Sequence, residues 1–171
     1  MKLSKHELAS FIETVHDFPK KGVSFKDLSA LLGRGLLPDL THFLAESVAD
    51  VEFDSVGCVE ARGFIYGTAL AQHLRKKIVL IRKPGKLAPP VFKKTYDLEY
   101  GQDALEIKAG TGRVLLVDDV LATGGTLRAA ADLCQMAGYT VAGFSVVMDL
   151  KFLNDFEWQG LQARSVYAIE P

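Results

Sequence analysis

The chain has 171 residues, of which 49% are hydrophobic, which is enough for a domain with a sizeable apolar core. Its 20 Lys and Arg residues nearly balance its 21 Asp and Glu residues, and the formal net charge is −1. This balance argues against a protein that binds nucleic acid or a membrane surface. No window approaches the ~18 uncharged apolar residues of a membrane span, and an amphipathic N-terminus with acidic residues is not typical of a signal peptide.

The two cysteines, Cys58 and Cys134, lie far apart in apolar segments. Two cysteines are too few for a disulfide framework, and they offer too few ligands for a zinc site. The sequence therefore predicts buried free thiols in a reducing compartment, and the expected location is the cytoplasm.

The first part of the chain is expected to contain two helices separated by a loop. Ser4 and Glu7 have the spacing of a capping box, which predicts a helix to about Val15. Residues 18–29 (FPKKGVSFKDLS) contain Pro and Gly without a clear period, which indicates a structured loop. A second helix is expected after Pro38. Its predicted apolar face has four members: Leu40, Phe43, Leu44 and Val48.

The rest of the chain alternates between strands and helices. Continuous apolar runs predict buried strands at 55–59, 76–81, 112–119, 139–150 and 163–169. Helical patterns occupy 64–76 and 126–139, the second closed by Gly138. An irregular stretch is expected at 85–94. Two short strands should follow at 95–101 and 103–110, joined at Gly101–Gln102.

This order predicts an α/β fold whose central, mostly parallel sheet is flanked by helices, because continuous apolar strands are typical of sheets covered on both faces. In such sheets, ligands bind at the carboxyl ends of the strands. Three predicted strand ends carry charged residues: Glu60–Ala61–Arg62, Arg82–Lys83 and Asp118–Asp119.

Residues 117–126 (VDDVLATGGT) combine an acid pair with a Gly-Gly turn between a strand and a helix. Gly124 and Gly125 let successive backbone N–H groups face one point, where the following helix adds its positive end. The hydroxyl groups of Thr123 and Thr126 supply further donors, so the turn suits a terminal phosphate. Asp118 and Asp119 would repel that phosphate but can accept hydrogen bonds from nearby hydroxyl groups. Together these features describe a site for ribose 5-phosphate.

The motifs of two common nucleotide-binding folds are absent from the sequence. A P-loop NTPase requires G-x-x-x-x-G-K-[ST], and a dinucleotide-binding fold requires G-x-G-x-x-G; the chain has neither motif. A buried strand that merely ends in a solvated turn is also disfavoured, because it would leave the coincidence of two acids and T-G-G-T without a cause.

The V-D-D-x-x-A-T-G-G-T pattern resembles the motif with which type I phosphoribosyltransferases bind phosphoribosyl diphosphate (PRPP). A-R-G-F near residue 62, R-K-P-G-K-L near 85 and L-E-Y-G near 100 resemble the adenine-specific members of this family. The resemblance extends from about Phe18 to Leu150. It implies a single domain over residues 1–171, with a base-binding hood at 1–36 and a flexible lid at 83–96.

The resemblance also implies the reaction: adenine and PRPP give AMP and pyrophosphate in purine salvage, which makes the chain a pentosyltransferase among the glycosyltransferases. Mg²⁺ would enter with PRPP, with no metal ligand supplied directly by the protein. Members of the family usually form homodimers. No nucleic-acid or membrane partner is expected.

Roles for individual residues follow from the same resemblance. The phosphate would be bound by Ala122, Thr123, Gly124, Gly125 and Thr126, and the ribose by Asp118 and Asp119. Pyrophosphate would be bound by Arg62, Arg82, Lys83 and Lys86. The adenine site would contain Ser24, Phe25, Lys26 and Glu99, with Phe25 stacking on the base. Glu99 would share a proton with N7 of the base, with Arg62 and Lys86 as further catalytic groups and Tyr100 ordering the lid.

The loop before Arg62 departs from the family pattern in one position. In the family an acid–Ser peptide, often cis, precedes this arginine, whereas here Ala61 follows Glu60. The substitution removes one hydroxyl group that could bind pyrophosphate.

Three alternative functions remain open. A PRPP-sensing regulator that binds nucleic acid should carry a strongly basic face, which a net charge of −1 disfavours. A phosphoribosyltransferase for another base, such as hypoxanthine, xanthine or orotate, would share the PRPP site. A PRPP synthetase is disfavoured, because the chain is short and has no apparent ATP-binding segment.

Overall fold

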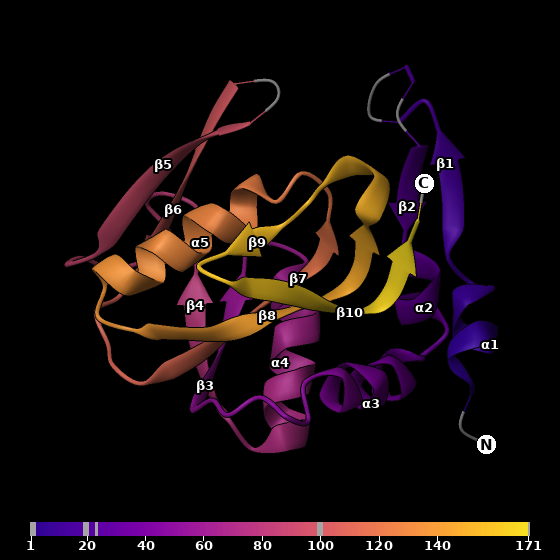
Figure 1. Ribbon diagram of the computed structural model, residues 1–171, viewed down its shortest axis with the longest axis horizontal. Coiled ribbons are helices and arrows are strands. Elements are labelled where there is room, and N and C mark those ends of the chain that lie inside the picture. Colours follow the sequence, from indigo (N-terminus) through magenta and orange to yellow (C-terminus); the bar gives the residue numbers. More distant parts are fainter. Residues whose placement is uncertain (1–2, 19–20, 23, 99–100, 171) are drawn as a thin grey trace.

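The computed structural model describes residues 3–18, 21–22, 24–98 and 101–170 (Figure 1). Its centre is a six-stranded sheet in the order β4-β3-β7-β8-β10-β9. The strands are β3 (Ser55–Val59), β4 (Lys77–Ile81), β7 (Arg113–Leu121), β8 (Thr140–Leu150), β9 (Glu157–Trp158) and β10 (Leu161–Ile169). Neighbouring strands are parallel except for β9, which runs antiparallel to β10. The predicted mostly parallel sheet is confirmed.

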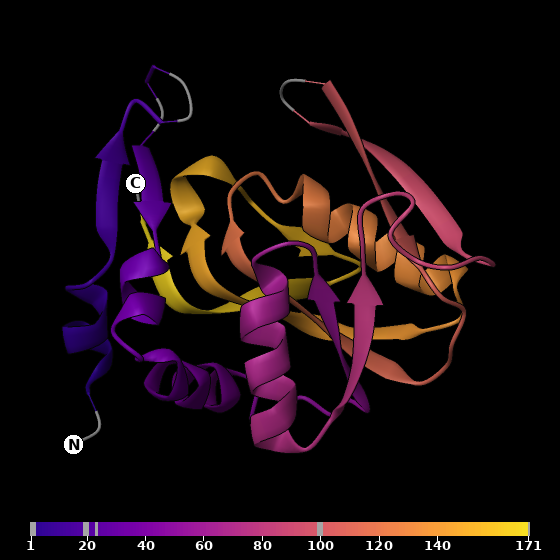
Figure 2. The ribbon, with the colours of Figure 1, turned by 180° about the vertical axis from the view of Figure 1, so that it is seen from behind.

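Helices cover both faces of this sheet (Figures 1 and 2). On one face α3 (Leu37–Ser47) and α4 (Gly63–Leu74) enclose a core that includes Tyr66 and Leu70. On the other face α5 (Gly125–Met136) covers a second core, which contains Phe144 and Trp158. Most residues of the central strands β7 and β8 are buried, which explains their continuous apolar runs. Within the described part of the chain, no helix combines the length and apolar character needed to cross a membrane.

Two antiparallel strand pairs stand above the sheet, on opposite sides of the carboxyl ends of its strands (Figures 1 and 2). One belongs to the hood, which consists of α1 (Lys5–Ala9), β1 (Glu13–His16), β2 (Ser24–Asp27) and α2 (Ser29–Gly33). The other is a hairpin of β5 (Phe92–Leu98) and β6 (Gly101–Ile107), which lies beside α5. This arrangement leaves the strand ends between the hood and the hairpin.

The hood differs from the sequence prediction in three places. The capping box is present, since the Ser4 hydroxyl accepts from the Glu7 backbone N–H and the Glu7 carboxylate accepts from the Ser4 backbone N–H. The helix nevertheless ends at Ala9, because residues 13–16 pair with 24–27 and place Val15 opposite Phe25. The predicted loop at 18–29 therefore contains strand β2. Helix α2 was not predicted.

The edge strand β4 and the hairpin also differ from the sequence prediction. The strand at 76–81 was expected to be buried, but β4 is an edge strand on which Ile78 is 44% and Leu80 43% exposed. The stretch expected to be irregular, 85–94, already enters β5 at Phe92. The junction expected at Gly101–Gln102 was wrong, because both residues lie within β6 and pair with Leu98 and Asp97 of β5. The short strand β9 and a 3₁₀ turn at Lys151–Leu153 were not predicted.

Cys58 and Cys134 are both fully buried free thiols, as predicted. Burial raises the pKa of each to about 12, so the reactive thiolate is scarce at neutral pH. We expect neither thiol of the native protein to react with a disulfide reagent at pH 8 during the time in which both react in guanidinium chloride. Fast reaction of either thiol in the native state would contradict this placement.

Candidate active site

The loop between β7 and α5 surrounds a cavity of about 90 Å³ at the carboxyl end of the sheet. We call residues 122–126 the phosphate loop, after their predicted role. Gly124 has a φ of +86°, and a Cβ there would lie 2.6 Å from Cδ2 of Phe156, so the turn requires glycine. The first turn of α5 has backbone N–H groups without intrahelical partners, and they suit an anion. The cavity is lined by residue 118 and residues 120–127. This set includes the five predicted phosphate-binding residues: Ala122, Thr123, Gly124, Gly125 and Thr126.

The acid pair precedes this loop on β7. Asp119 is buried, and its Oδ2 lies 2.5 Å from Nε of Arg62. Oδ1 of Asp118 accepts a 2.9 Å hydrogen bond from the Asp119 backbone N–H. Burial, followed by the negative charge of Asp119, holds the pKa of Asp118 well above its usual range, while Arg62 acts in the opposite direction. The pair therefore favours a partner that brings hydroxyl groups or positive charge.

Arg62 joins the acid pair to the hood. It is the residue before α4, and its side chain is 47% exposed. Besides its contact with Asp119, its guanidinium carbon lies 5.2 Å from the ring centroid of Phe25 on β2, which is cation–π distance. The Glu60–Ala61 peptide before it is cis, although Ala stands where the family usually has Ser. One guanidinium group thus touches a predicted ribose-binding acid and the predicted base-stacking ring.

The three predicted base-binding residues of the hood lie together on β2: Ser24, Phe25 and Lys26. The Ser24 hydroxyl is 3.2 Å from Nδ1 of His16, and the Lys26 ammonium donates a 2.8 Å hydrogen bond to the Thr14 hydroxyl. These two side chains are therefore engaged within the hood.

Glu60 holds the start of the predicted lid. Its carboxylate accepts hydrogen bonds from Nε and Nη2 of Arg82, at 3.1 and 3.4 Å, and from the Lys83 backbone N–H at 2.8 Å. Nη1 of Arg82 donates to the backbone carbonyl of Lys86 at 3.2 Å, while Lys86 itself is exposed. Arg82 is therefore engaged by protein groups, and a pyrophosphate would have to compete with Glu60 for it. The sequence interpretation missed Glu60 as the partner of Arg82.

The ammonium group of Lys83 contacts Oδ2 of Asp103 on strand β6 of the hairpin. The Tyr96 hydroxyl donates to the same oxygen at 3.2 Å and lies 3.4 Å from the hydroxyl of Thr126 in the phosphate loop. The sequence interpretation did not single out Tyr96 or Asp103. Both residues lie in the two strands predicted from the sequence, but a turn at Gly101–Gln102 would not have placed them opposite each other. The observed register, in which Gly101 and Gln102 belong to β6, makes them cross-strand partners.

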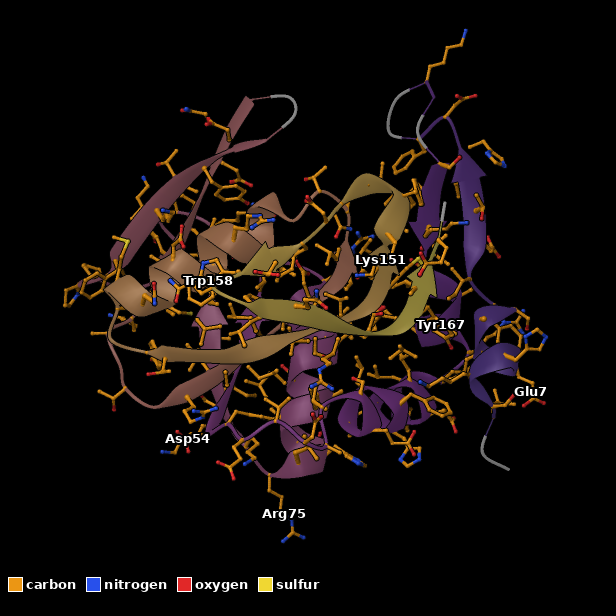
Figure 3. All side chains as sticks on the ribbon, viewed as in Figure 1. Glu7, Asp54, Arg75, Lys151, Trp158 and Tyr167 are labelled. Atoms are coloured by element: carbon orange, nitrogen blue, oxygen red, sulfur yellow. The ribbon has the colours of Figure 1, made fainter. Side chains whose placement is uncertain are left out.

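A further buried acid lies at the end of β8, where Asp149 stands opposite Leu121 in the sheet register. Its Oδ2 lies 2.7 Å from the Lys151 ammonium, and its Oδ1 accepts a 3.0 Å hydrogen bond from Asn154. Figure 3 shows Lys151 near the end of the sheet that bears the hood, far from Asp54 at the opposite end. The sequence interpretation overlooked this group, although the predicted strand at 139–150 carries an acid next to its last residue and a base follows it directly.

Glu99 and Tyr100 lie outside the described residues, so their predicted roles remain predictions. Among the residues that the structure does describe, no cluster of three or more His, Cys, Asp or Glu side chains could hold a metal ion. The chemistry at the strand ends consists of an anion cradle, two carboxylates, several cations and an aromatic ring.

Comparison with known families agrees with this site. The family described as the phosphoribosyl transferase domain matches residues 33–151, which contain the acid pair and the phosphate loop. The chain belongs to the phosphoribosyltransferase family.

Three proteins similar to this chain all belong to one group within this family. The adenine phosphoribosyltransferase of Hydrogenovibrio crunogenus is 43% identical over 167 residues, covering 96% of this chain and 97% of the relative. The crystal structure of the adenine phosphoribosyltransferase from Thermoanaerobacter pseudethanolicus matches with a TM-score of 0.87 and 35% identity, covering 97% and 100% of the two chains. The Giardia lamblia enzyme, solved with 9-deazaadenine, matches with a TM-score of 0.86 and 34% identity over 99% of both chains. Within its family, the chain's place is among the adenine phosphoribosyltransferases.

Proposed function

We propose that the chain transfers the 5-phosphoribosyl group of PRPP to adenine, giving AMP and pyrophosphate. The observation that carries this proposal is the contact of Arg62 with both Asp119 and Phe25 beside the phosphate loop. It brings groups suited to a phosphate, a ribose and a planar base to one end of the sheet. The adenine-specific relatives supply the identity of the base.

The reaction requires the C1–O bond to the diphosphate to break, with the electron pair leaving on pyrophosphate. N9 of adenine forms the new bond to C1 and loses its proton. The phosphate loop binds the 5′-phosphate, and Asp118 and Asp119 accept hydrogen bonds from the ribose hydroxyls. These contacts fix the reacting carbon while Arg62 and Lys86 offset the charge that grows on the leaving group.

A base screen tests this function. The purified protein is mixed with PRPP, Mg²⁺ and one of adenine, hypoxanthine, guanine, xanthine or orotate, and nucleotide and pyrophosphate are followed by chromatography. We expect AMP from adenine and no nucleotide from the other bases. Turnover of a different base would contradict the adenine assignment but retain the PRPP site. PRPP binding without turnover of any base would favour a sensor.

Glu99 is proposed as the proton partner at N7 of the base. Replacing Glu99 with Gln should lower kcat by about 10²-fold or more, because the amide cannot share a proton in this way. Steady-state kinetics with saturating PRPP and adenine provide the measurement. Glu52→Gln, an exposed glutamate elsewhere in the chain, is the matched control. A loss of less than about threefold would reduce Glu99 to a binding role.

Mg²⁺ is proposed to enter with PRPP. The donor set fits this ion, because Mg²⁺ prefers oxygen ligands and keeps several waters, through which Asp118 and Asp119 could reach it. Oδ2 of Asp119 is a buried oxygen without a hydrogen-bond partner among the described residues, although it lies 2.5 Å from Nε of Arg62. When bound, Mg²⁺ would offset the charge of the diphosphate.

The proposed domain organisation is a single phosphoribosyltransferase domain over residues 1–171, with the hood at 1–36 and a lid at 83–96 that closes over PRPP. The lid would exclude water from the reacting carbon. A cytoplasmic location is proposed because both cysteines are free thiols, which suits a reducing compartment.

A homodimer is proposed through the exposed edge of the sheet. Ile78 and Leu80 of β4 alternate along the strand and so share one face, and Ile65 of the neighbouring helix α4 is 38% exposed. We expect wild-type protein to have twice the chain mass by light scattering, and Leu80→Lys to shift it toward one chain mass. Met136→Lys on α5, which also replaces an exposed apolar side chain, should leave the mass unchanged. A monomeric wild type would contradict the proposal.

A further inference from the structure

A chain of polar contacts connects Lys83 and the β5–β6 hairpin with the phosphate loop. It runs from Lys83 through Asp103 and Tyr96 to Thr126. Tyr96 and Asp103 stand directly opposite each other in the antiparallel pair, so their side chains share one face of the hairpin. The register of the hairpin therefore creates the contact between the tyrosine hydroxyl and the carboxylate.

The direction of these hydrogen bonds follows from the number of available protons. An ionised carboxylate only accepts, so Asp103 takes the single hydroxyl proton of Tyr96 and one ammonium proton of Lys83. Thr126 must then donate its own hydroxyl proton to Tyr96, so its backbone N–H in the first turn of α5, and not its hydroxyl, is left for a phosphate. Lys83 retains two N–H groups, and they are available to an anion.

Both members of the Lys83–Asp103 pair are charged in this environment. Burial alone would lower the pKa of Lys83, but its hydrogen bond to Asp103 raises that pKa overall. Burial alone would raise the pKa of Asp103, but its hydrogen bond to Lys83 lowers that pKa overall. The Lys83 side chain is 37% exposed, so a ligand can still reach its ammonium group.

We propose that Asp103 and Tyr96 are positioning residues, which hold the Lys83 ammonium in place for the diphosphate of PRPP and tie it to the loop that binds the 5′-phosphate. This inference rests on the proposed function. Both phosphate ends of one substrate would then be bound by groups that belong to a single hydrogen-bonded chain. Asp103 itself touches neither PRPP nor adenine.

The first test is Asp103→Asn, which keeps the shape of the side chain but removes the charge. We expect the PRPP KM to rise about tenfold, the size of effect typical of a lost charge-assisted hydrogen bond, while the adenine KM and kcat stay within about twofold. Calorimetric titration with PRPP should show the same loss in Kd. Tyr96→Phe, which removes only one hydroxyl group, should raise the PRPP KM about threefold. An unchanged PRPP KM in both variants would overturn the proposal.

A double-mutant cycle separates positioning from a general structural role. If Asp103 acts through Lys83, Asp103→Asn should add little to the effect of Lys83→Met. If the two effects multiply instead, Asp103 does not act through Lys83 and the proposal fails.

Asp132→Asn is the matched control, because Asp132 on α5 pairs with Lys94 of the same hairpin at 2.9 Å. An amide at this position can still accept the 2.8 Å hydrogen bond from Nε1 of Trp158. We expect its PRPP KM to stay within about twofold. An equal rise of the PRPP KM in this control would mean that both variants act by loosening the hairpin from α5. That result would overturn the proposal. Failure of the proposed function itself would appear differently, as a wild-type protein that forms no AMP.

Discussion

Gly63→Ala should lower kcat/KM for PRPP by about 10²-fold, because a misplacement near 1 Å in a catalytic constellation has effects of this size. An added Cβ would lie 2.8 Å from the backbone oxygen of Val117 and 3.1 Å from Oδ1 of Asp118. Backbone atoms cannot move aside cheaply, so the turn that carries Arg62 must shift away from the acid pair. Overpacking of this kind costs about 1–3 kcal/mol, so the melting temperature should also fall.

Gly33→Ala is the control for this prediction. Gly33 also lies in a helix, but its added Cβ would meet no atom within 4 Å. This variant should keep wild-type kinetics and gain slightly in stability, because alanine restricts the unfolded chain more than glycine does. Steady-state kinetics and thermal unfolding measure both variants. Wild-type kcat/KM in Gly63→Ala would show that the spacing between α4 and β7 does not govern the reaction.

Replacing Asp118 and Asp119 together with Asn should lower kcat/KM for PRPP by roughly 10²–10⁴-fold. Each carboxylate is expected to accept a hydrogen bond from a ribose hydroxyl, and hydrogen bonds to charged groups contribute about 1.5–3 kcal/mol each. Initial rates at varied PRPP provide the measurement. Asp50→Asn, which breaks a surface ion pair with Arg164, should change the kinetics by less than twofold. Unchanged kinetics in the double variant would rule out the ribose assignment.

The stability of Asp118→Asn should change in the opposite direction from its activity. The folded protein holds the pKa of Asp118 above its usual range, so ionised Asp118 lowers the free energy of unfolding at neutral pH. This penalty disappears as the pH falls below the usual carboxyl range, and also when the charge is removed. Asp118→Asn should therefore melt no lower than wild type at pH 7, so a loss of activity could not be attributed to unfolding.

Local signals in the sequence predicted the centre of the fold well. Strand β7 and helix α5 followed from a continuous apolar run, a Gly-Gly turn and a closing Gly138, all of which act over a few residues. The hood was predicted less well because its strand pair exists only through partners such as Val15 and Phe25, ten positions apart. Periodicity also could not show that β4 lies at the edge of the sheet, since an apolar strand has the same pattern in either place.

The residues of the site also differ in how well they could be predicted: a contiguous motif was found, and pairs distant in the sequence were missed. Asp118, Asp119 and the phosphate loop form one contiguous motif, so residue chemistry and family resemblance located them together. The pairing of Glu60 with Arg82 joins residues separated by 22 positions, and that of Lys83 with Asp103 joins residues separated by 20. Such pairs depend on strand order and register. The sequence provided their charges but not their partners.

The attachment of the hood constrains the order in which parts of the protein can fold during synthesis. The Tyr167 hydroxyl donates a 2.9 Å hydrogen bond to the backbone carbonyl of Lys5, and Leu8 is buried in the same core as Val166 of β10. Synthesis runs from the N-terminus to the C-terminus, so residues 5–8 can reach this position only after β10 has been synthesised and has paired with β8. A nascent chain can therefore form β7 and the phosphate loop before its hood is anchored. A chain cut short before β10 would lack the contacts that hold Lys5 and Leu8.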